Sequence, residues 1–144
     1  MSPDSGSVFL VLAGLARKGL GGGLGSGKQY VSWIHQTDFA EAISFLIDRD
    51  DLNGAINLCS PNPLPQAEFM TDLRKAVGSK FGIPAPEFLV ELGTWVMRTE
   101  SELVLKSRRV IPTRLLEAGF KFEYPAWQDA ANDLAKQIYF PKSI

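Results

Sequence analysis

A nearly unbroken apolar run marks the first predicted helix of the chain. Residues 8–16 read VFLVLAGLA, and a helix that is apolar on most sides is normally buried on most sides. We therefore predict a helix over residues 7–18, which Gly19 ends because glycine readily adopts the conformation that follows a helix. The run is about half of the ~20 residues needed to cross a bilayer, so we expect it to pack inside a protein. No Lys or Arg precedes it, which argues against a signal peptide.

The second predicted helix is clearly amphipathic. Its apolar residues recur every three or four positions: Phe39, Ala42, Ile43, Leu46 and Ile47. We expect Asp38 to cap the first N–H groups of this helix, with Glu41 completing a capping box. The same apolar spacing, with proline near the start of each segment, predicts four further helical stretches: 65–77, 84–96, 112–119 and 125–138.

Three short segments have the composition of strands. They are residues 29–35, which are rich in aromatic and β-branched side chains, the apolar run 55–59, and the alternating run 120–124. Strands separated by helices favour a parallel α/β arrangement. Three strands make a small sheet, and such a sheet needs cover on both faces, so we expect the chain to be part of a larger fold. The three tryptophans fall in apolar patterns and are expected in the core: Trp33, Trp95 and Trp127.

The glycine-rich loop invites comparison with phosphate-binding loops. Residues 22–28 spell G-x-x-x-x-G-K, but Gln29 follows where a nucleoside-triphosphate loop needs Ser or Thr to ligate magnesium. The flanks are also reversed, because a helix precedes these glycines and a strand follows them. The dinucleotide fingerprint G-x-G-x-x-G fails as well. We therefore interpret residues 19–28 as a mobile connection that brings Lys28 to the edge of a pocket.

Composition limits the possible partners. The chain has 144 residues, with 15 basic and 16 acidic side chains, so its field is too weak to attract nucleic acid or an anionic membrane. Cys59 is the only cysteine, which fits a reducing cytoplasm, and we expect its thiol to be inert in a buried strand. We predict no metal site, because His35 and Asp38 offer only two adjacent ligands.

Two polar residues are weak site candidates on their own evidence. His35 is the sole histidine, so it either binds a ligand or, as we favour, bonds local backbone at the end of a strand. Asn62 follows the predicted strand 55–59, and open α/β sheets bind ligands beyond the carboxyl ends of their strands.

Several separated motifs together resemble one family. They are Gly25 to Ile43 with its Ser-Trp-Ile-His core, Asn57 to Pro63, Glu68-Phe69, and Arg109 to Pro125. This set is similar to the C-terminal portion of the extended short-chain dehydrogenase/reductases, the NAD(P)-dependent epimerase/dehydratase group. The closest likeness is to a sugar-nucleotide-epimerase-like subfamily with a small C-terminal domain of unassigned function. The resemblance runs from about Ser2 to Leu134.

The resemblance implies a fold that is only partly present. Family members begin with a nucleotide-binding half that carries a glycine fingerprint and a Tyr-x-x-x-Lys pair, and neither occurs here. The three tyrosines are followed four positions later by Ile34, Gln128 and Ser143. We therefore expect the C-terminal part of a Rossmann-like doubly wound α/β fold, with few short strands and five or six helices. Residues 1–84 would belong to the epimerase-like α/β domain and residues 85–144 to a small, mostly helical domain.

The resemblance also implies a function. Lys28 matches a basic residue that often meets a substrate phosphate in the family, unless it is simply an exposed surface lysine, and Gln29 is placed to assist it. We expect Lys28, Gln29, His35 and Asn62 to bind a small substrate such as a phosphorylated or nucleotide sugar. NAD or NADP would serve the full-length family, whereas the chain alone would bind neither and would be inactive. The alternative is a self-sufficient binding or oligomerisation module derived from such enzymes. If the nucleotide-binding half is missing, the apolar face of residues 8–16 is exposed, and we expect it to make the chain a homo-oligomer.

Overall fold

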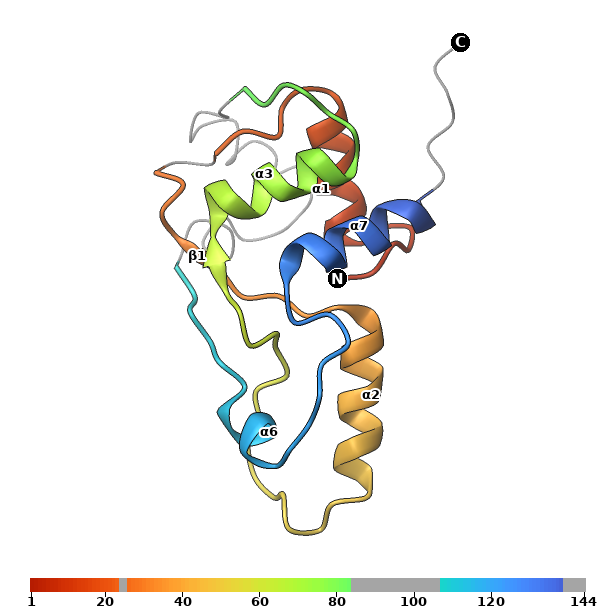
Figure 1. The fold of residues 1–144 in the computed structure, drawn as a ribbon, viewed down its shortest axis with the longest axis vertical. Coiled ribbons are helices and arrows are strands. Elements are labelled where there is room, and N and C mark those ends of the chain that lie inside the picture. The colour runs from red at the N-terminus through yellow and green to blue at the C-terminus, as the bar shows by residue number, and fades with distance from the viewer. Residues whose placement is uncertain (24–25, 84–106, 139–144) are drawn as a thin grey trace.

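The computed structural model of the chain describes residues 1–23, 26–83 and 107–138 (Figure 1). Its elements, in chain order, are α1 (Val8–Arg17), β1 (Tyr30–Val31), α2 (Gln36–Ile47), β2 (Leu64–Pro65), α3 (Gln66–Ala76), α6 (Thr113–Glu117) and α7 (Trp127–Gln137). The predicted mixture of helices with few short strands is confirmed for these residues. The helix predicted at 84–96 and the boundary predicted after residue 84 lie outside the described residues. In the described part, no helix combines the length and apolar composition that a membrane crossing requires.

The main core lies where α1, α3 and α7 meet, in the upper part of Figure 1. Its centre is Trp127, whose ring stacks on Phe69 at 3.9 Å and meets Trp33 edge-on at 5.1 Å. The indole N–H of Trp127 donates to the carbonyl of Phe69 over 2.9 Å, so the one polar atom of this ring is satisfied. The core positions predicted for Trp33 and Trp127 are confirmed. Trp95 lies outside the described residues.

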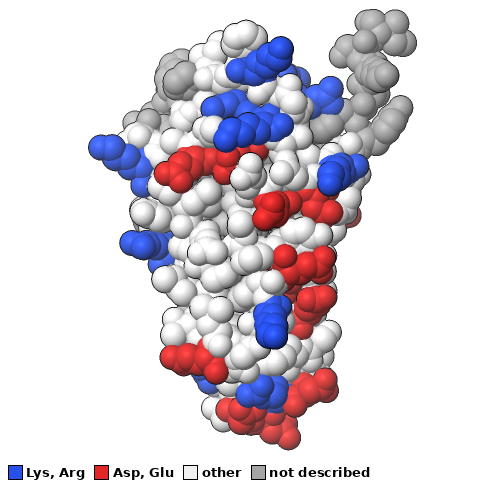
Figure 2. All heavy atoms as spheres, in the orientation of Figure 1, with Lys and Arg blue, Asp and Glu red and all other residues white. Residues whose placement is uncertain are grey.

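A second, smaller cluster holds α2 against α6 in the lower part of Figure 1. Ala42, Leu115 and Phe120 form its buried centre. The opposite side of α2 leaves Phe39 and Ile47 exposed, at 47% and 74%. Charged side chains are unevenly distributed over the face in Figure 2. Acidic side chains are frequent on the side that carries α2, and basic side chains are frequent where α1 and α3 end.

The sheet differs from the prediction. The structure has one antiparallel pair, in which Tyr30 lies opposite Pro65 and Val31 opposite Leu64. Pro65 suits this edge position because proline has no N–H to donate to a ladder. The predicted strands 55–59 and 120–124 and their parallel arrangement were wrong for this structure. Residues 120–124 do not form a ladder, and the backbone N–H groups of Glu123 and Tyr124 bond to a side chain instead.

That side chain belongs to Asp38, and the prediction that Asp38 caps α2 was also wrong. The helix begins at Gln36, and its N-cap is His35. Asp38 has no exposed surface, and its carboxylate accepts from the backbone N–H of Glu123 at 2.7 Å and of Tyr124 at 3.1 Å. The Asp38 carboxylate, which local pattern assigns to the first N–H groups of the helix, therefore bonds instead to N–H groups far along the chain. The result is a polar clamp between α2 and the segment that leads into α7.

Candidate functional site

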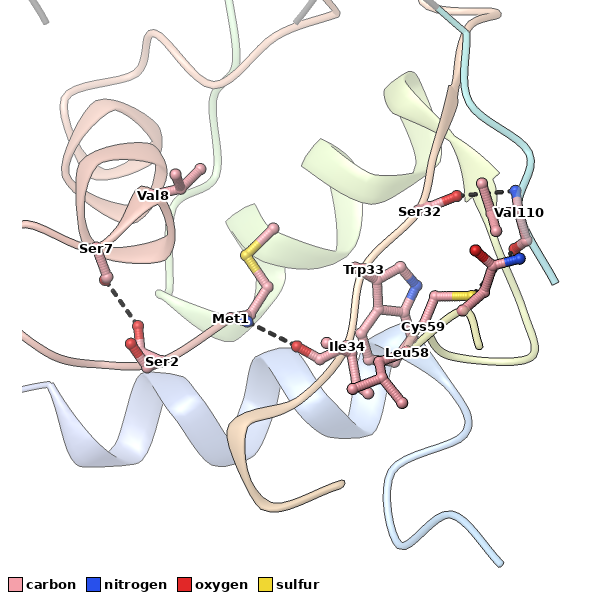
Figure 3. A pocket seen from close by; sticks show the side chains of 11 residues that line it. Met1, Ser2, Ser7, Val8, Ser32, Trp33, Ile34, Leu58, Cys59 and Val110 are labelled. Carbon is pink, nitrogen blue, oxygen red and sulfur yellow. Dashed lines mark hydrogen bonds between the residues drawn. The ribbon is translucent and has the colours of Figure 1, made fainter. Parts of the chain in front are cut away.

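A cavity of about 510 Å³ opens beside the extended segment that follows β1 (Figure 3). Its wall is made of short runs of consecutive residues: Met1, Ser2, Ser7, Val8, Ser32, Trp33, Ile34, Asn57, Leu58, Cys59 and Val110. Because neighbouring side chains of an extended segment point to opposite sides, a run of three consecutive lining residues means that backbone forms part of the wall. The cavity is therefore bounded by main chain as well as by side chains.

Hydrogen bonds fix most of this wall. Ser32 Oγ donates to the carbonyl of Arg108 at 2.7 Å and accepts from the N–H of Val110 at 3.0 Å. The N–H of Ser60 donates to the carbonyl of Trp33 at 2.6 Å. The N-terminal ammonium of Met1 donates to the carbonyl of Ile34 at 2.6 Å, and burial lowers the pKa of this ammonium. These bonds hold residues 32–34 in place from three directions.

One stretch of the wall is not held in this way. In the described part of the chain, no backbone–backbone hydrogen bond involves residues 55–59. The carbonyl of Ala55 accepts from the Arg114 guanidinium at 2.9 Å, and Asn57 is exposed. This stretch is not a strand in the structure, and its backbone groups have no backbone partner among the described residues. We call residues 55–59 the open edge, because proteins normally cover or pair such backbone.

The lining chemistry suits binding more than catalysis. Its polar groups are serine hydroxyls, the Asn57 amide and the Cys59 thiol, and none of the lining residues described is Lys, His, Tyr, Asp or Glu. Cys59 is 6% exposed, and its Sγ lies 3.6 Å from the carbonyl of Val110, to which it donates. Burial raises the pKa of the Cys59 thiol, so the reactive thiolate is disfavoured. The described lining side chains offer hydrogen bonds to a ligand but no general acid or base, and the Met1 ammonium is bonded to the carbonyl of Ile34.

Lys28 and Gln29 lie at the end of the glycine loop. The Lys28 side chain is exposed, and the backbone N–H of Lys28 donates to Ser26 Oγ at 3.3 Å. Gln29 is only 9% exposed, and its carbonyl accepts from the N–H of Gln66 at 2.8 Å. The loop is tied down at both described ends, since Gly22 bonds to Ile83 and Gly27 bonds to Ala67. These bonds anchor the two flanks of the loop, and the mobility expected between them stays a prediction.

His35 is buried at the start of α2 and has no exposed surface. Its Nδ1 accepts from the N–H of Thr37 at 3.2 Å, so the ring carries its proton on Nε2, which lies 3.3 Å from Asp133 Oδ2. The ring also packs on Tyr124 at 4.0 Å. Burial lowers the pKa of His35, and the nearby Asp133 carboxylate partly opposes that shift. The favoured reading, a histidine that bonds local backbone, agrees with this geometry.

Asn62 is exposed beyond the open edge. Its side-chain N–H donates to the carbonyl of Pro125 at 3.0 Å, and its backbone carbonyl accepts from the Trp33 indole N–H at 3.2 Å. None of the four predicted site residues is part of the cavity wall described above. The lining residues Ser32 and Asn57 were missed as site residues, because each is a single polar side chain in a strand-like run and the motifs around them indicated a family rather than a binding role. In the described residues, no three His, Cys, Asp or Glu side chains gather to hold a metal ion.

The fold and the cavity thus define a helix-rich α/β unit with a cavity and the open edge at residues 55–59. Residues 85–134 match a family described as a domain of unknown function, DUF1731. The chain is 36% identical over 118 residues to an epimerase family protein of Staphylococcus aureus, covering 82% of this chain and 38% of that protein. It is 30% identical to the epimerase family protein YfhF of Bacillus subtilis, covering 79% of this chain and 37% of that protein.

Solved structures agree with these matches. The human epimerase family protein SDR39U1 (isoform 2), solved with NADPH, has a TM-score of 0.84 at 27% identity, covering 96% of this chain and 46% of that one. A functionally unknown conserved protein from Silicibacter pomeroyi DSS has a TM-score of 0.64 at 20% identity, which shows a likeness of fold alone; the match covers 82% of this chain and 42% of that one. The chain is therefore similar to a C-terminal portion of the epimerase family proteins. It spans about two fifths of the length of the curated relatives that it matches.

Proposed function

We propose that this chain is the substrate-side portion of an NAD(P)-dependent epimerase-like oxidoreductase and does not catalyse alone. The observation that carries the proposal is the cavity itself, which has hydrogen-bonding groups but no acid or base in its described wall. In short-chain dehydrogenases of this kind, the other half of the fold binds the cofactor and carries the catalytic tyrosine. More than half of each matched relative lies outside the match, which is room enough for that half.

The open edge at residues 55–59 supports a docking partner on this side of the cavity. Unpaired backbone groups of an extended segment are a template for another strand. We infer that a strand of the nucleotide-binding half pairs here and closes the cavity against the cofactor. The human relative was solved with NADPH, so the dinucleotide is the cofactor that we expect in the assembled protein.

The test joins the chain to the part of the Bacillus subtilis relative that lies outside the match. NADPH is titrated into the chain alone, into that part alone and into the joined protein, and binding is followed by the NADPH fluorescence. We expect no binding by the chain at micromolar concentrations and clear binding by the joined protein. Hydrogen exchange should also slow at residues 55–59 on joining, while Glu123 and Tyr124, whose N–H groups already bond to Asp38, serve as the internal reference. NADPH binding by the chain alone would contradict the proposal.

A second function is a self-sufficient module that associates with itself. The observation in its favour is the apolar stripe on α2, where Phe39, Ile43 and Ile47 are 47%, 39% and 74% exposed. Three side chains four positions apart share one face of a helix. Sedimentation of the chain and of Ile47→Glu distinguishes the two functions. A dimer that Ile47→Glu dissociates would support the module, whereas self-association that survives Ile47→Glu, with no NADPH binding by the chain alone, supports the substrate-side portion.

A further inference from the structure

Two consecutive arginines lie at one end of the cavity. Arg108 and Arg109 are both exposed, and they directly precede Val110, which lines the cavity. The segment that carries them, cyan in Figure 1, begins beside β1. Nothing in the sequence motifs had singled out these two side chains as binding residues. Their setting nevertheless differs from that of an ordinary surface cation in three respects.

The first is that their backbone is fixed. The N–H of Tyr30 donates to Ser107 Oγ at 3.0 Å, and the N–H of Arg108 donates to the carbonyl of Tyr30 at 3.0 Å. Two residues further on, Ser32 Oγ bonds to both Arg108 and Val110. Residues 107–110 therefore run alongside residues 30–32, and each hydrogen bond along the way limits the freedom of the chain. The arginines project from a constrained stretch of backbone.

The second is the position of the Arg109 guanidinium, which lies 4.9 Å from the centre of the Tyr30 ring. A cation over an aromatic face is attracted by the ring quadrupole, and this contact leaves the N–H groups at the edge of the guanidinium available. A guanidinium positioned over a ring has less freedom to lose when it binds an oxyanion with two parallel hydrogen bonds.

The third is the lack of a counter-charge. Among the described residues, no carboxylate lies within ion-pair distance of Arg108 or Arg109, whereas Arg49 pairs with Asp51 at 2.7 Å and Lys75 pairs with Asp72 at 3.1 Å. Lys28, two residues before Tyr30, is exposed near the same end of the segment. Within the described part of the chain, this end of the cavity therefore carries positive side chains without a paired carboxylate.

We propose that Arg108 and Arg109 bind the phosphate of a phosphorylated polyhydroxyl substrate whose uncharged part occupies the cavity. The hydroxyls of Ser7 and Ser32 and the amide of Asn57 offer donors and acceptors for alcohol groups. The described wall holds no carboxylate to repel an anion. The proposal rests on the proposed function, since it names the substrate class of the same cavity. It shifts the phosphate site from Lys28 to the arginine pair, and Lys28 then contributes only long-range attraction.

The test is an NMR titration of the full chain with glucose 1-phosphate, glucose and inorganic phosphate, each to about 20 mM, a range that reveals even millimolar affinity. We expect glucose 1-phosphate to shift the amides of Arg109 and Leu58 together, and glucose alone to bind at least tenfold more weakly. Arg108→Ala and Arg109→Ala should each weaken binding about tenfold, consistent with loss of a charge-assisted contact. Arg109→Lys should fall between, because lysine keeps the charge but loses the fork. Lys121→Ala, at another exposed cation, is the matched control and should change nothing.

Three outcomes would overturn the proposal. Cavity shifts that survive the Arg108→Ala, Arg109→Ala double variant would remove the arginine role and leave the substrate-binding cavity intact. Inorganic phosphate bound as well as glucose 1-phosphate, with no shift at Leu58, would mean that the arginines bind anions independently of the cavity. No shift with any probe would contradict the arginine site, whereas the proposed function would still be decided separately by NADPH binding to the joined protein.

Discussion

The clamp made by Asp38 can be tested by removing its carboxylate. Asp38 is fully buried and accepts from two backbone N–H groups that lie far along the chain. Asp38→Ala removes the acceptor of two part-buried N–H groups, and a buried N–H without a partner costs about 1–3 kcal/mol. Glu123 is exposed, so water can replace part of the lost bonding, and we expect the free energy of unfolding to fall by ~2–4 kcal/mol. A lost helix cap would cost only about 1 kcal/mol, so the two roles differ in magnitude.

The assay is urea unfolding followed by tryptophan fluorescence and by circular dichroism. Because a whole domain is stable by only about 5–15 kcal/mol, Asp38→Ala risks leaving too little folded protein to measure. Asp38→Asn is the milder variant, since it keeps one acceptor and turns the other into a donor facing an N–H, and we expect it to lose about 1–3 kcal/mol.

Glu41→Ala is the matched control for this experiment. Glu41 is exposed on the same helix and was the partner of Asp38 in the expected capping box. The clamp predicts a change within about 0.5 kcal/mol for Glu41→Ala. If both alanine variants instead lost similar amounts near 1 kcal/mol, the capping box would be restored and the clamp refuted.

Four further substitutions test other parts of the structure. Burial lowers the pKa of His35 below its ordinary 6.5, so the folded state favours the neutral ring, and stability should fall as the pH drops below about 6.5, by at most ~1.4 kcal/mol per pH unit. His35→Asn keeps an N-cap acceptor without a titrating ring, so its urea midpoint should vary less with pH. Gly14→Ala should stabilise by about 0.5–1 kcal/mol, because the new methyl meets nothing within 4 Å in α1. Gly21→Ala should destabilise by about 1–3 kcal/mol, since its Cβ would lie 2.8 Å from Ala16 Cα. Leu134→Ala should cost about 2–5 kcal/mol by opening a void in a fully buried site.

Thermal or urea unfolding of these variants gives a clear contrary result in each case. An unchanged pH profile in His35→Asn would mean that His35 does not carry the acid sensitivity. Equal effects of Gly14→Ala and Gly21→Ala would mean that the close approach of the glycine loop to α1 does not constrain the fold. A loss below about 1 kcal/mol for Leu134→Ala would argue that α7 is not packed as described.

Local pattern predicted the helices better than the strands. Residues 8–16 and 39–47 became α1 and α2 because helical periodicity depends on neighbours in sequence. The runs 55–59 and 120–124 have strand composition, but a strand also needs a partner. Residues 55–59 have no backbone partner among the described residues. The backbone N–H groups of residues 123–124 donate to the Asp38 carboxylate instead of to a neighbouring strand. Composition alone does not contain that information.

The site was harder to predict than the fold. Lys28 and His35 stood out as a lone lysine in a glycine loop and a lone histidine, yet His35 is buried at a helix start and neither side chain lines the cavity. Ser32 and Val110 come together from distant parts of the sequence through one hydroxyl. A motif search sees spacing along the chain, whereas this cavity depends on which extended segments lie side by side.

The central ring of the core has a consequence for how the chain folds. Trp127 begins the last described helix, but its contacts reach Phe9 in the first helix and Phe69 in the third. During synthesis, α1 and α3 emerge with their apolar faces uncovered until α7 has left the ribosome. Contacts between the two ends of a sequence form slowly, because a long loop must close first. Nascent chains that stop before Trp127 should therefore stay open to chaperones and proteases, and this core should form only once α7 is available to pack on α1 and α3.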